Sequence, residues 1–193
     1  DQYFYAASQF AFQRNGMERN PWDSAVQFRD ELITRTFPPD SGVTATYSFH
    51  IDGSVPANLA LVVERPDLYQ ITCNGRPVRA RTGAWWLDES FGRLEIAEAA
   101  QSGENVVVLK AQPFTIYHEL EPVYVLGDFT LRAADRGFVV TANAPMRLGR
   151  WNEQGLPLYS HGVSYTQRFA APRGAGRHTV ALRAWHGSVA EVK

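Results

Sequence analysis

The sequence places two acidic side chains beside a histidine, and these groups are the first candidates for chemistry. Glu119 and Glu121 alternate with His118 and Leu120. In an extended chain both carboxylates therefore face one side, while His118 and Leu120 face the other. A glycosidase needs two carboxylates about 5–9 Å apart on facing elements, with the sugar between them. Alternate positions on one strand do not provide that arrangement, so the pair does not predict catalysis.

Three other uses of this pair remain open. Carboxylate oxygens are the hard ligands that Ca²⁺ prefers, so Glu119 and Glu121 are candidate calcium ligands together with a nearby carbonyl group. Alternatively, they contact a sugar, or they form salt bridges with Arg132 or Arg136 across a sheet. Calcium is the one cofactor that these residue types suggest.

Tryptophan residues suggest a second kind of chemistry, the recognition of sugars. Adjacent strand residues face opposite sides, so we expect one of Trp85 and Trp86 to enter the core and the other to reach the surface. An exposed indole can stack on the apolar face of a pyranose while polar neighbours bond the hydroxyl groups. The alternative is that these rings are covered by the core or by another domain. The candidate sugar contacts are Trp85, Trp86, Trp151, Arg81, Asp88 and Tyr117.

Composition argues against several other classes of protein. The chain has 19 basic and 20 acidic residues and a net charge of -1, which gives no electrostatic basis for binding nucleic acid. No stretch approaches the roughly 20 apolar residues of a membrane span. The single Cys73 excludes an intrachain disulfide and a cysteine-based zinc site. The histidines, which show no metal-binding spacing, are His50, His118, His161, His178 and His186. We therefore expect no catalytic centre within this chain.

The sequence changes its period near residue 42. Apolar residues recur at helical spacing from Phe4 until Gly16, and Asn20 followed by Pro21 predicts the start of a second short helix that reaches Ile33. Alternating patterns and turn residues then predict strands at 44–51, 59–63, 69–73, 85–87, 94–96, 106–110, 124–126, 129–132 and 138–141. Many short strands indicate an all-β fold, a jelly-roll-type antiparallel β-sandwich with a short N-terminal helical lead-in.

An internal repeat suggests a second sandwich. Residues 42–49 match 162–169, residues 59–63 match 180–184, and residues 68–72 match 189–193. The second copy stops where its Asn-Gly turn is expected. We therefore expect a helical lead-in at 1–41, a sandwich at 42–150, and the truncated start of a related sandwich at 151–193. The alternative is that the last strands complete the first sandwich.

Several blocks of the sequence resemble a known family. They are NPWDSAVQ at 20–27, VERPDLY at 63–69, ELEPVYVLGDF at 119–129, WNEQGLPLY at 151–159 and WHGSVAEV at 185–192. Together they resemble the C-terminal β-sandwich region of large bacterial glycoside hydrolases related to the family 106 α-L-rhamnosidases. Those sandwiches are similar to the galactose-binding-like, sugar-binding jelly roll of family 2 glycoside hydrolases. Because the catalytic carboxylates of that family lie on a separate barrel, none is carried onto this chain.

The resemblance implies a non-catalytic, carbohydrate-binding accessory module of a secreted or periplasmic enzyme for polysaccharide degradation. Its expected partners are a polysaccharide or oligosaccharide and the catalytic domain of the parent chain, with no nucleic acid and no membrane. The alternative is a purely structural spacer that packs on the catalytic barrel and binds no sugar.

Overall fold

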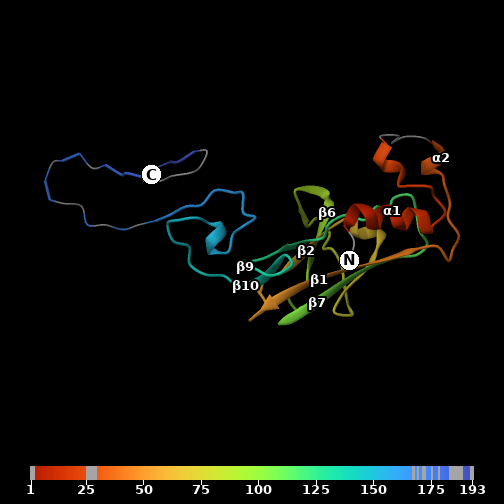
Figure 1. Ribbon diagram of the computed structural model, residues 1–193, viewed down its shortest axis with the longest axis horizontal. Helices are drawn as coiled ribbons and strands as arrows, with labels where there is room; N and C mark the ends of the chain where they lie inside the picture. Colours follow the sequence, from red (N-terminus) through yellow and green to blue (C-terminus); the bar gives the residue numbers. More distant parts are fainter. Residues whose placement is uncertain are drawn as a thin grey trace. The chain divides into compact units, whose positions relative to one another are not determined.

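The structure is a computed structural model that describes residues 3–24, 30–166, 168, 170, 173–174, 176–177, 179–182 and 189–191. The chain divides into two compact units, Asp1–Ser160 and His161–Lys193. The first unit is mostly β, with two sheets and a short N-terminal helix (Figure 1). The expected all-β class is confirmed at the level of a β-sandwich-like architecture.

Six strands form the larger sheet, in the order β4-β3-β7-β1-β10-β9. In that order they span Arg76–Val78, Gln70–Cys73, Gly103–Ala111, Val43–Asp52, Phe138–Ala142 and Phe129–Ala133. The smaller sheet has the order β5-β6-β2-β8, with strands Trp85–Trp86, Asp88–Glu95, Ala60–Glu64 and Tyr124–Leu126. Neighbouring strands are antiparallel, except that β1 runs parallel to β10, with Ile51 opposite Val140.

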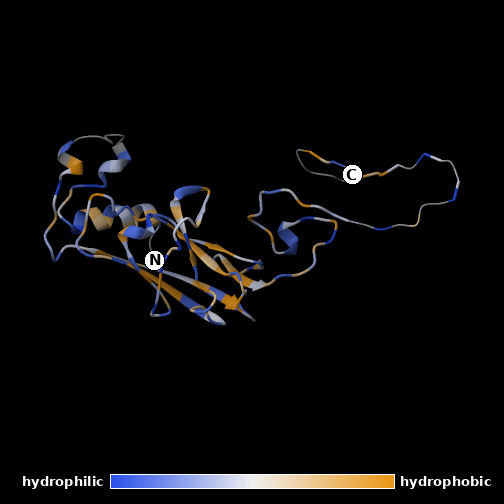
Figure 2. Cartoon of the chain, turned by 180° about the vertical axis from the view of Figure 1, so that it is seen from behind, coloured by the Kyte–Doolittle hydropathy of each residue, from blue (hydrophilic) through white to orange (hydrophobic). Residues whose placement is uncertain are grey.

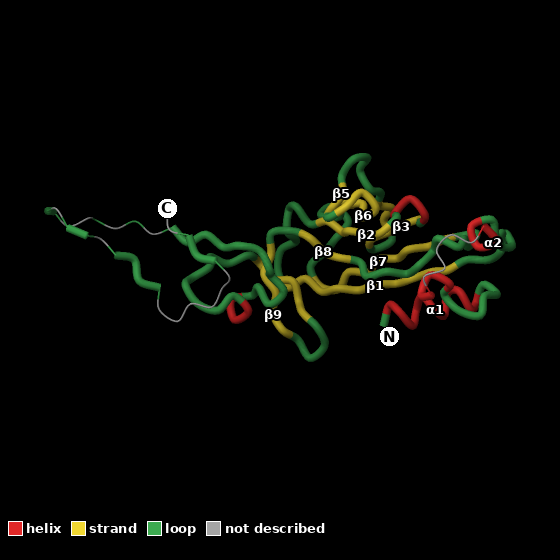
Figure 3. The backbone as a smooth tube through the Cα atoms, turned by 90° about the horizontal axis from the view of Figure 1, so that it is seen from above, coloured by secondary structure: helices red, strands yellow, loops and turns green. Residues whose placement is uncertain are grey.

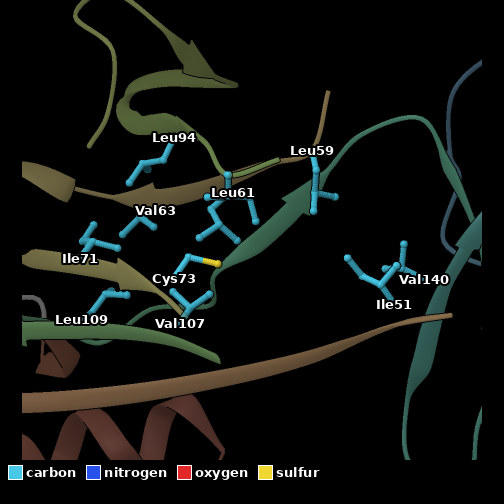
Figure 4. Packing of buried hydrophobic residues seen from close by; sticks show 11 residues of the cluster. Ile51, Leu59, Leu61, Val63, Ile71, Cys73, Leu94, Val107, Leu109 and Val140 are labelled. Atoms are coloured by element: carbon cyan, nitrogen blue, oxygen red, sulfur yellow. The ribbon is translucent and has the colours of Figure 1, made fainter. Parts of the chain in front are cut away.

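The two sheets enclose one hydrophobic core. Strand alternation points Val107 and Leu109 of β7 inward, where they meet Leu61 of β2 and Leu94 of β6 (Figure 4). Each fully buried side chain of this size contributes about 1.5–3 kcal/mol to folding. Cys73 lies in the same core, and burial raises the pKa of its thiol. Figure 2 shows hydrophobic residues alternating with hydrophilic ones along the strands, as a half-buried sheet requires.

The predicted strands are all present, although some of their ends differ. The sequence misses β4, and β6 begins at Asp88 rather than at residue 94. Likewise β7 begins at Gly103, three residues before the predicted strand 106–110, although Gly103 and Asn105 are typical turn residues. Asn105 is instead fully buried, and its side chain both donates to and accepts from the backbone of Gln101. A polar residue can therefore lie within this strand because its hydrogen bonds are satisfied locally.

The N-terminal residues form helix α1 (Phe4–Arg14), the 3-10 helix η1 (Pro21–Ser24) and the short helix α2 (Asp30–Ile33). The predicted second helix also includes residues 25–29, which lie outside the described residues. Helix α1 lies beside the larger sheet (Figures 1 and 3). It packs on the crossover segment, residues 112–123, which connects β7 to β8. This second core contains Ala11, Phe12, Phe114, Ile116 and Leu120. Among the described helices, none is long and apolar enough to cross a membrane.

The first compact unit ends at Ser160. Its last part includes the 3-10 helix η3 (Asn152–Gln154), and Leu131 of β9 donates its backbone N–H to the carbonyl of Gly155 at 2.7 Å. In the second unit, the described residues form no helix or strand, including 180–182 of the repeat. Residues 183–184, 192–193 and most of the block 185–192 lie outside the described residues. The second sandwich therefore stays a prediction.

Candidate functional site

A cleft with a volume of about 160 Å³ opens where three parts of the first unit meet. Helix η1 contributes one ring, the end of β2 and the following turn contribute two charged groups and a tyrosine, and the crossover segment contributes a ring and a carboxylate. The lining residues are Trp22, Glu64, Arg65, Tyr69, Tyr117 and Glu119.

Two aromatic rings that stack on each other line this cleft. The rings of Trp22 and Tyr117 are nearly parallel, with an interplanar angle of 22° and centroids 6.3 Å apart. Trp22 is held in place because its indole Nε1–H donates to the carbonyl oxygen of Ile116 at 2.7 Å. Tyr117 is 43% exposed, so its ring is partly open to solvent. The cleft therefore has one aromatic ring that is held in place and one that a ligand can reach.

Asn20 positions both Trp22 and Glu119. The Asn20 side-chain oxygen accepts a hydrogen bond from the backbone N–H of Trp22 at 3.1 Å, which is the N-capping role that the sequence predicted. The Asn20 amide donates to Oε1 of Glu119 at 2.6 Å, and the Asn20 backbone N–H donates to Gln9 at 2.8 Å. Because Asn20 is only 2% exposed, these bonds form in the interior, where they hold Trp22 and Glu119 in position.

The carboxylates around the cleft repel one another. Burial raises the pKa of Glu64, and the neighbouring charges of Glu119 and Asp88 raise it further, while Arg65 opposes them. Burial also raises the pKa of Glu121, with further contributions from Glu119 and Glu64. In the described part of the chain, none of Glu64, Glu119 and Glu121 takes part in a salt bridge. The site is therefore acidic.

A strained turn brings Arg65 to the edge of the cleft. Arg65 has a φ of 45°, which is uncommon for a residue other than glycine, and its backbone N–H donates to Ser90 of β6 at 2.8 Å. Its guanidinium bonds both carboxylate oxygens of Asp67, at 3.1 and 2.9 Å. The next residue, Pro66, packs against Gly92, where a Cβ would lie 2.5 Å from its Cγ. This turn reverses the chain between Glu64 and Tyr69.

The structure brings some of the predicted site residues together. Tyr117, a predicted sugar contact, and Glu119, a predicted calcium ligand, line the same cleft. The predicted alternation is confirmed, because His118 and Leu120 are buried whereas Glu119 and Glu121 are half-buried. His118 accepts a hydrogen bond from the backbone N–H of Thr115 at its Nδ1 and lies 3.0 Å from the Leu68 carbonyl at its Nε2. It therefore has a structural role.

The other predicted sugar contacts lie outside this cleft. Trp85 is 50% exposed, as one of the two adjacent tryptophans was expected to be. Trp86 does not enter the core but packs on Tyr124, with centroids 5.5 Å apart, on the other face of the sheet. The reason is a register shift between Trp85 and Trp86 on a two-residue edge strand, which breaks the expected alternation.

The remaining three predicted contacts have other neighbours. Asp88 accepts hydrogen bonds from the hydroxyl and the backbone N–H of Ser90, at 2.6 and 2.8 Å, and these bonds lower the pKa of its carboxyl. Arg81 is exposed. Trp151 is half-buried and meets Tyr159 edge to face, with centroids 6.1 Å apart.

Two predicted uses of Glu119 and Glu121 were a salt bridge with Arg132 or Arg136 and the binding of calcium. Arg132 bonds Asp52 at 2.7 Å rather than either glutamate, so that expected salt bridge is wrong. Within the described residues, no group of three or more His, Cys, Asp or Glu side chains could hold a metal ion. Calcium binding by Glu119 and Glu121 stays a prediction.

Sequence reasoning missed four of the six cleft residues. Glu64, Arg65 and Tyr69 belong to the VERPDLY block, and Trp22 follows the predicted N-cap, so each stood in a motif that had been noticed. Nothing in the sequence, however, indicated that these motifs meet Tyr117. Comparison of the chain with protein-family models, curated proteins and solved structures finds no match. The resemblance to the rhamnosidase-related sandwiches therefore stays a prediction.

Proposed function

We propose that this chain is a non-catalytic, carbohydrate-binding accessory module of a bacterial glycoside hydrolase, and that it holds one sugar ring in the cleft beside Trp22 and Tyr117. The observation that supports it best is the pair of nearly parallel rings, one of them fixed by a hydrogen bond, next to the polar groups of Glu64 and Arg65. An aromatic face combined with a few polar groups is the usual composition of a sugar site.

The size of the cleft supports a small ligand. Its volume of about 160 Å³ is below the range of roughly 300–1,000 Å³ that is typical of sites for drug-sized molecules. One monosaccharide unit at the end or side of a glycan is therefore the proposed occupant. With one stacking wall, we expect weak binding, with a Kd of roughly 10⁻³ to 10⁻⁵ M, or about 4–7 kcal/mol.

We also propose the fold type, location and partner that the sequence predicts. The sandwich is proposed to be a galactose-binding-like jelly roll, exported with its parent chain to the periplasm or the medium, with the parent's catalytic domain as its partner. Catalysis is assigned to that other domain. Turnover of aryl glycosides by this chain, lost on Glu64→Gln, would contradict the non-catalytic assignment.

A structural spacer is the second candidate, and one surface favours it. On the outer face of the smaller sheet, Tyr124 contacts both Trp86 and Phe91, and Trp85 and Leu87 are exposed. Exposed apolar groups of this kind can pack on another domain. A spacer needs no sugar, so binding measurements separate the two candidates.

The test is a calorimetric or NMR titration of the full chain with a panel of glycans and methyl glycosides. Tyr117→Ala should abolish binding while leaving the melting temperature within a few degrees of wild type. Tyr124→Ala is the matched control, because Tyr124 is exposed to a similar extent, 40%, but lies outside the cleft. Equal losses in both variants, or no binding by the wild-type chain, would favour the spacer.

A further inference from the structure

The two carboxylates of the cleft accept few hydrogen bonds from the protein. Trp22 uses its only side-chain donor on Ile116, and Tyr69 directs its hydroxyl to the carbonyl oxygen of Glu119 at 3.1 Å. Arg65 directs two of its five N–H groups to Asp67. Tyr117 retains a hydroxyl group. In contrast, among the described residues no side chain donates to the carboxylate of Glu64, and the carboxylate of Glu119 accepts one side-chain hydrogen bond, from Asn20 at Oε1.

A neutral sugar carries no charge to match these carboxylates. Each sugar hydroxyl offers both a donor and two acceptor lone pairs, so it is best bound by a mixture of donors and acceptors. An ionised carboxylate only accepts. An ammonium group, which has three donors and no acceptor, matches an acceptor-rich site.

The charges around the cleft favour the same kind of ligand. Glu64 and Glu119 line it, and Glu121 and Asp88 lie close enough to influence Glu64 or its neighbours. Arg65, the positive group of the lining, is paired with Asp67. A bound cation would relieve the repulsion between these carboxylates. The electron-rich faces of Trp22 and Tyr117 add to this attraction, because a cation within about 6 Å of a ring centroid is stabilised.

We infer that the cleft selects an amino sugar, a hexose unit with a free, protonated amine, and binds its ammonium group at Glu64 and Glu119 with its apolar ring face on Trp22 and Tyr117. This inference rests on the proposed function and specifies its ligand. The carboxylates provide the selectivity for the charge, and the rings provide the selectivity for a sugar over a simple amine.

The test compares methyl glycosides that differ only at C2, titrated into the full chain at low salt. They are methyl glucosaminide, its N-acetyl derivative and methyl glucoside, with methylamine as a cation that has no ring. We expect methyl glucosaminide to bind at least tenfold more tightly than the other three. Among the three glycosides, we expect its affinity alone to fall on adding 0.5 M NaCl, because salt screens partly exposed charges.

Two variants assign the effect to the cleft. Glu64→Gln should remove the advantage of the amine, so that methyl glucosaminide and methyl glucoside bind with similar affinity. Glu89→Gln, on an exposed glutamate of β6 outside the cleft, should retain the advantage. Melting curves of both variants show whether they are folded.

The outcomes separate this inference from the proposed function. Equal binding of the charged and neutral glycosides would overturn the inference and leave sugar binding intact. Equal binding of methylamine and methyl glucosaminide would overturn it too, because the ring would then contribute nothing. No binding of any glycoside would overturn both.

Discussion

Asn20 and Glu119 are joined by a hydrogen bond of 2.6 Å between positions that are 99 residues apart in the chain. This bond ties the N-terminal segment to the crossover segment. Asn20 also caps η1 and accepts the N–H of Trp22, so the same buried side chain places one ring and one carboxylate of the cleft. The helical lead-in is thus part of the site.

Replacing Asn20 by alanine should destabilise the chain by about 1–3 kcal/mol, because the cap is lost and buried partners are left unpaired. Urea unfolding measures this change. Asn20→Asp keeps the capping oxygen but replaces the amide donor with a second carboxylate that faces Glu119. We expect its stability to be poor at pH 7 and to recover in acid. An alanine variant as stable as the wild-type chain would show that the bond does not contribute to the free energy of unfolding.

Neutralising Glu121 should stabilise the fold at neutral pH. Burial and its acidic neighbours raise the pKa of Glu121 above the ordinary value of 4.5. A carboxyl whose pKa is higher in the folded state favours folding when it is protonated, and this contribution is lost as the pH rises through the folded-state pKa. Glu121→Gln should therefore gain a few tenths to about 1 kcal/mol at pH 7, since solvent weakens such interactions. The gain should vanish near pH 4 or below.

The same measurements test the calcium alternative. Calcium held by Glu119 and Glu121 would raise the melting temperature of the wild-type chain by binding the folded state, and Glu121→Gln would abolish that rise. Melting curves with calcium chloride and with a chelator distinguish a metal effect from simple repulsion.

Phe114 of the crossover segment lies in the second core. It is 1% exposed and meets Phe12 and Phe37 edge to face, with centroids 5.2 and 5.1 Å away. Phe114→Ala should cost about 3–5 kcal/mol and also weaken sugar binding, because the second core carries the crossover segment. Phe138→Ala is the control, since Phe138 is 42% exposed, and it should cost less than about 1 kcal/mol. Comparable losses in both variants would contradict this account.

Gly92 allows the strained turn to pack. A Cβ at this position would lie 2.5 Å from Cγ of Pro66 and 3.2 Å from Cβ of Ala80. Gly92→Ala should therefore displace the turn that holds Arg65, with a cost of about 1–3 kcal/mol and a loss of cleft binding. Gly176→Ala, where nothing lies within 4 Å, should change neither stability nor binding. Thermal melts and sugar titrations on both variants check this.

Trp85 and Trp86 should respond differently to substitution. Trp85→Ala should change stability by no more than about 0.5 kcal/mol, because the side chain is half exposed. Trp86→Ala should cost more, because its ring packs on Tyr124. Neither change should affect the cleft. A loss of glycan binding in Trp85→Ala would move the sugar site to the β5–β6 hairpin, where the sequence had suggested it.

Strands were predictable from local patterns, whereas the cleft was not. The alternation in β1 and β7 and the Asn74-Gly75 turn, in which both residues have positive φ, depend on neighbours in the sequence. The cleft depends on contacts between distant segments, such as Trp22 with Ile116. Tyr117 and Glu119 were identified separately, for sugar and for calcium, because residue type indicates chemistry but not which groups share a cavity. The expectation that one of Trp85 and Trp86 enters the core was wrong because an edge-strand bulge leaves no clear sequence signal.

The position of β1 has a consequence for biosynthesis. This strand lies in the middle of its sheet, yet its pairing partners are far along the chain, with Val43 opposite Ala111 and Ile51 opposite Val140. During translation, at about 5–20 residues per second, β1 waits for several seconds with both edges unpaired. An unpaired strand edge is a template for association with other chains. The cellular yield of this protein is therefore expected to depend on ribosome-associated chaperones, even where the purified chain refolds well.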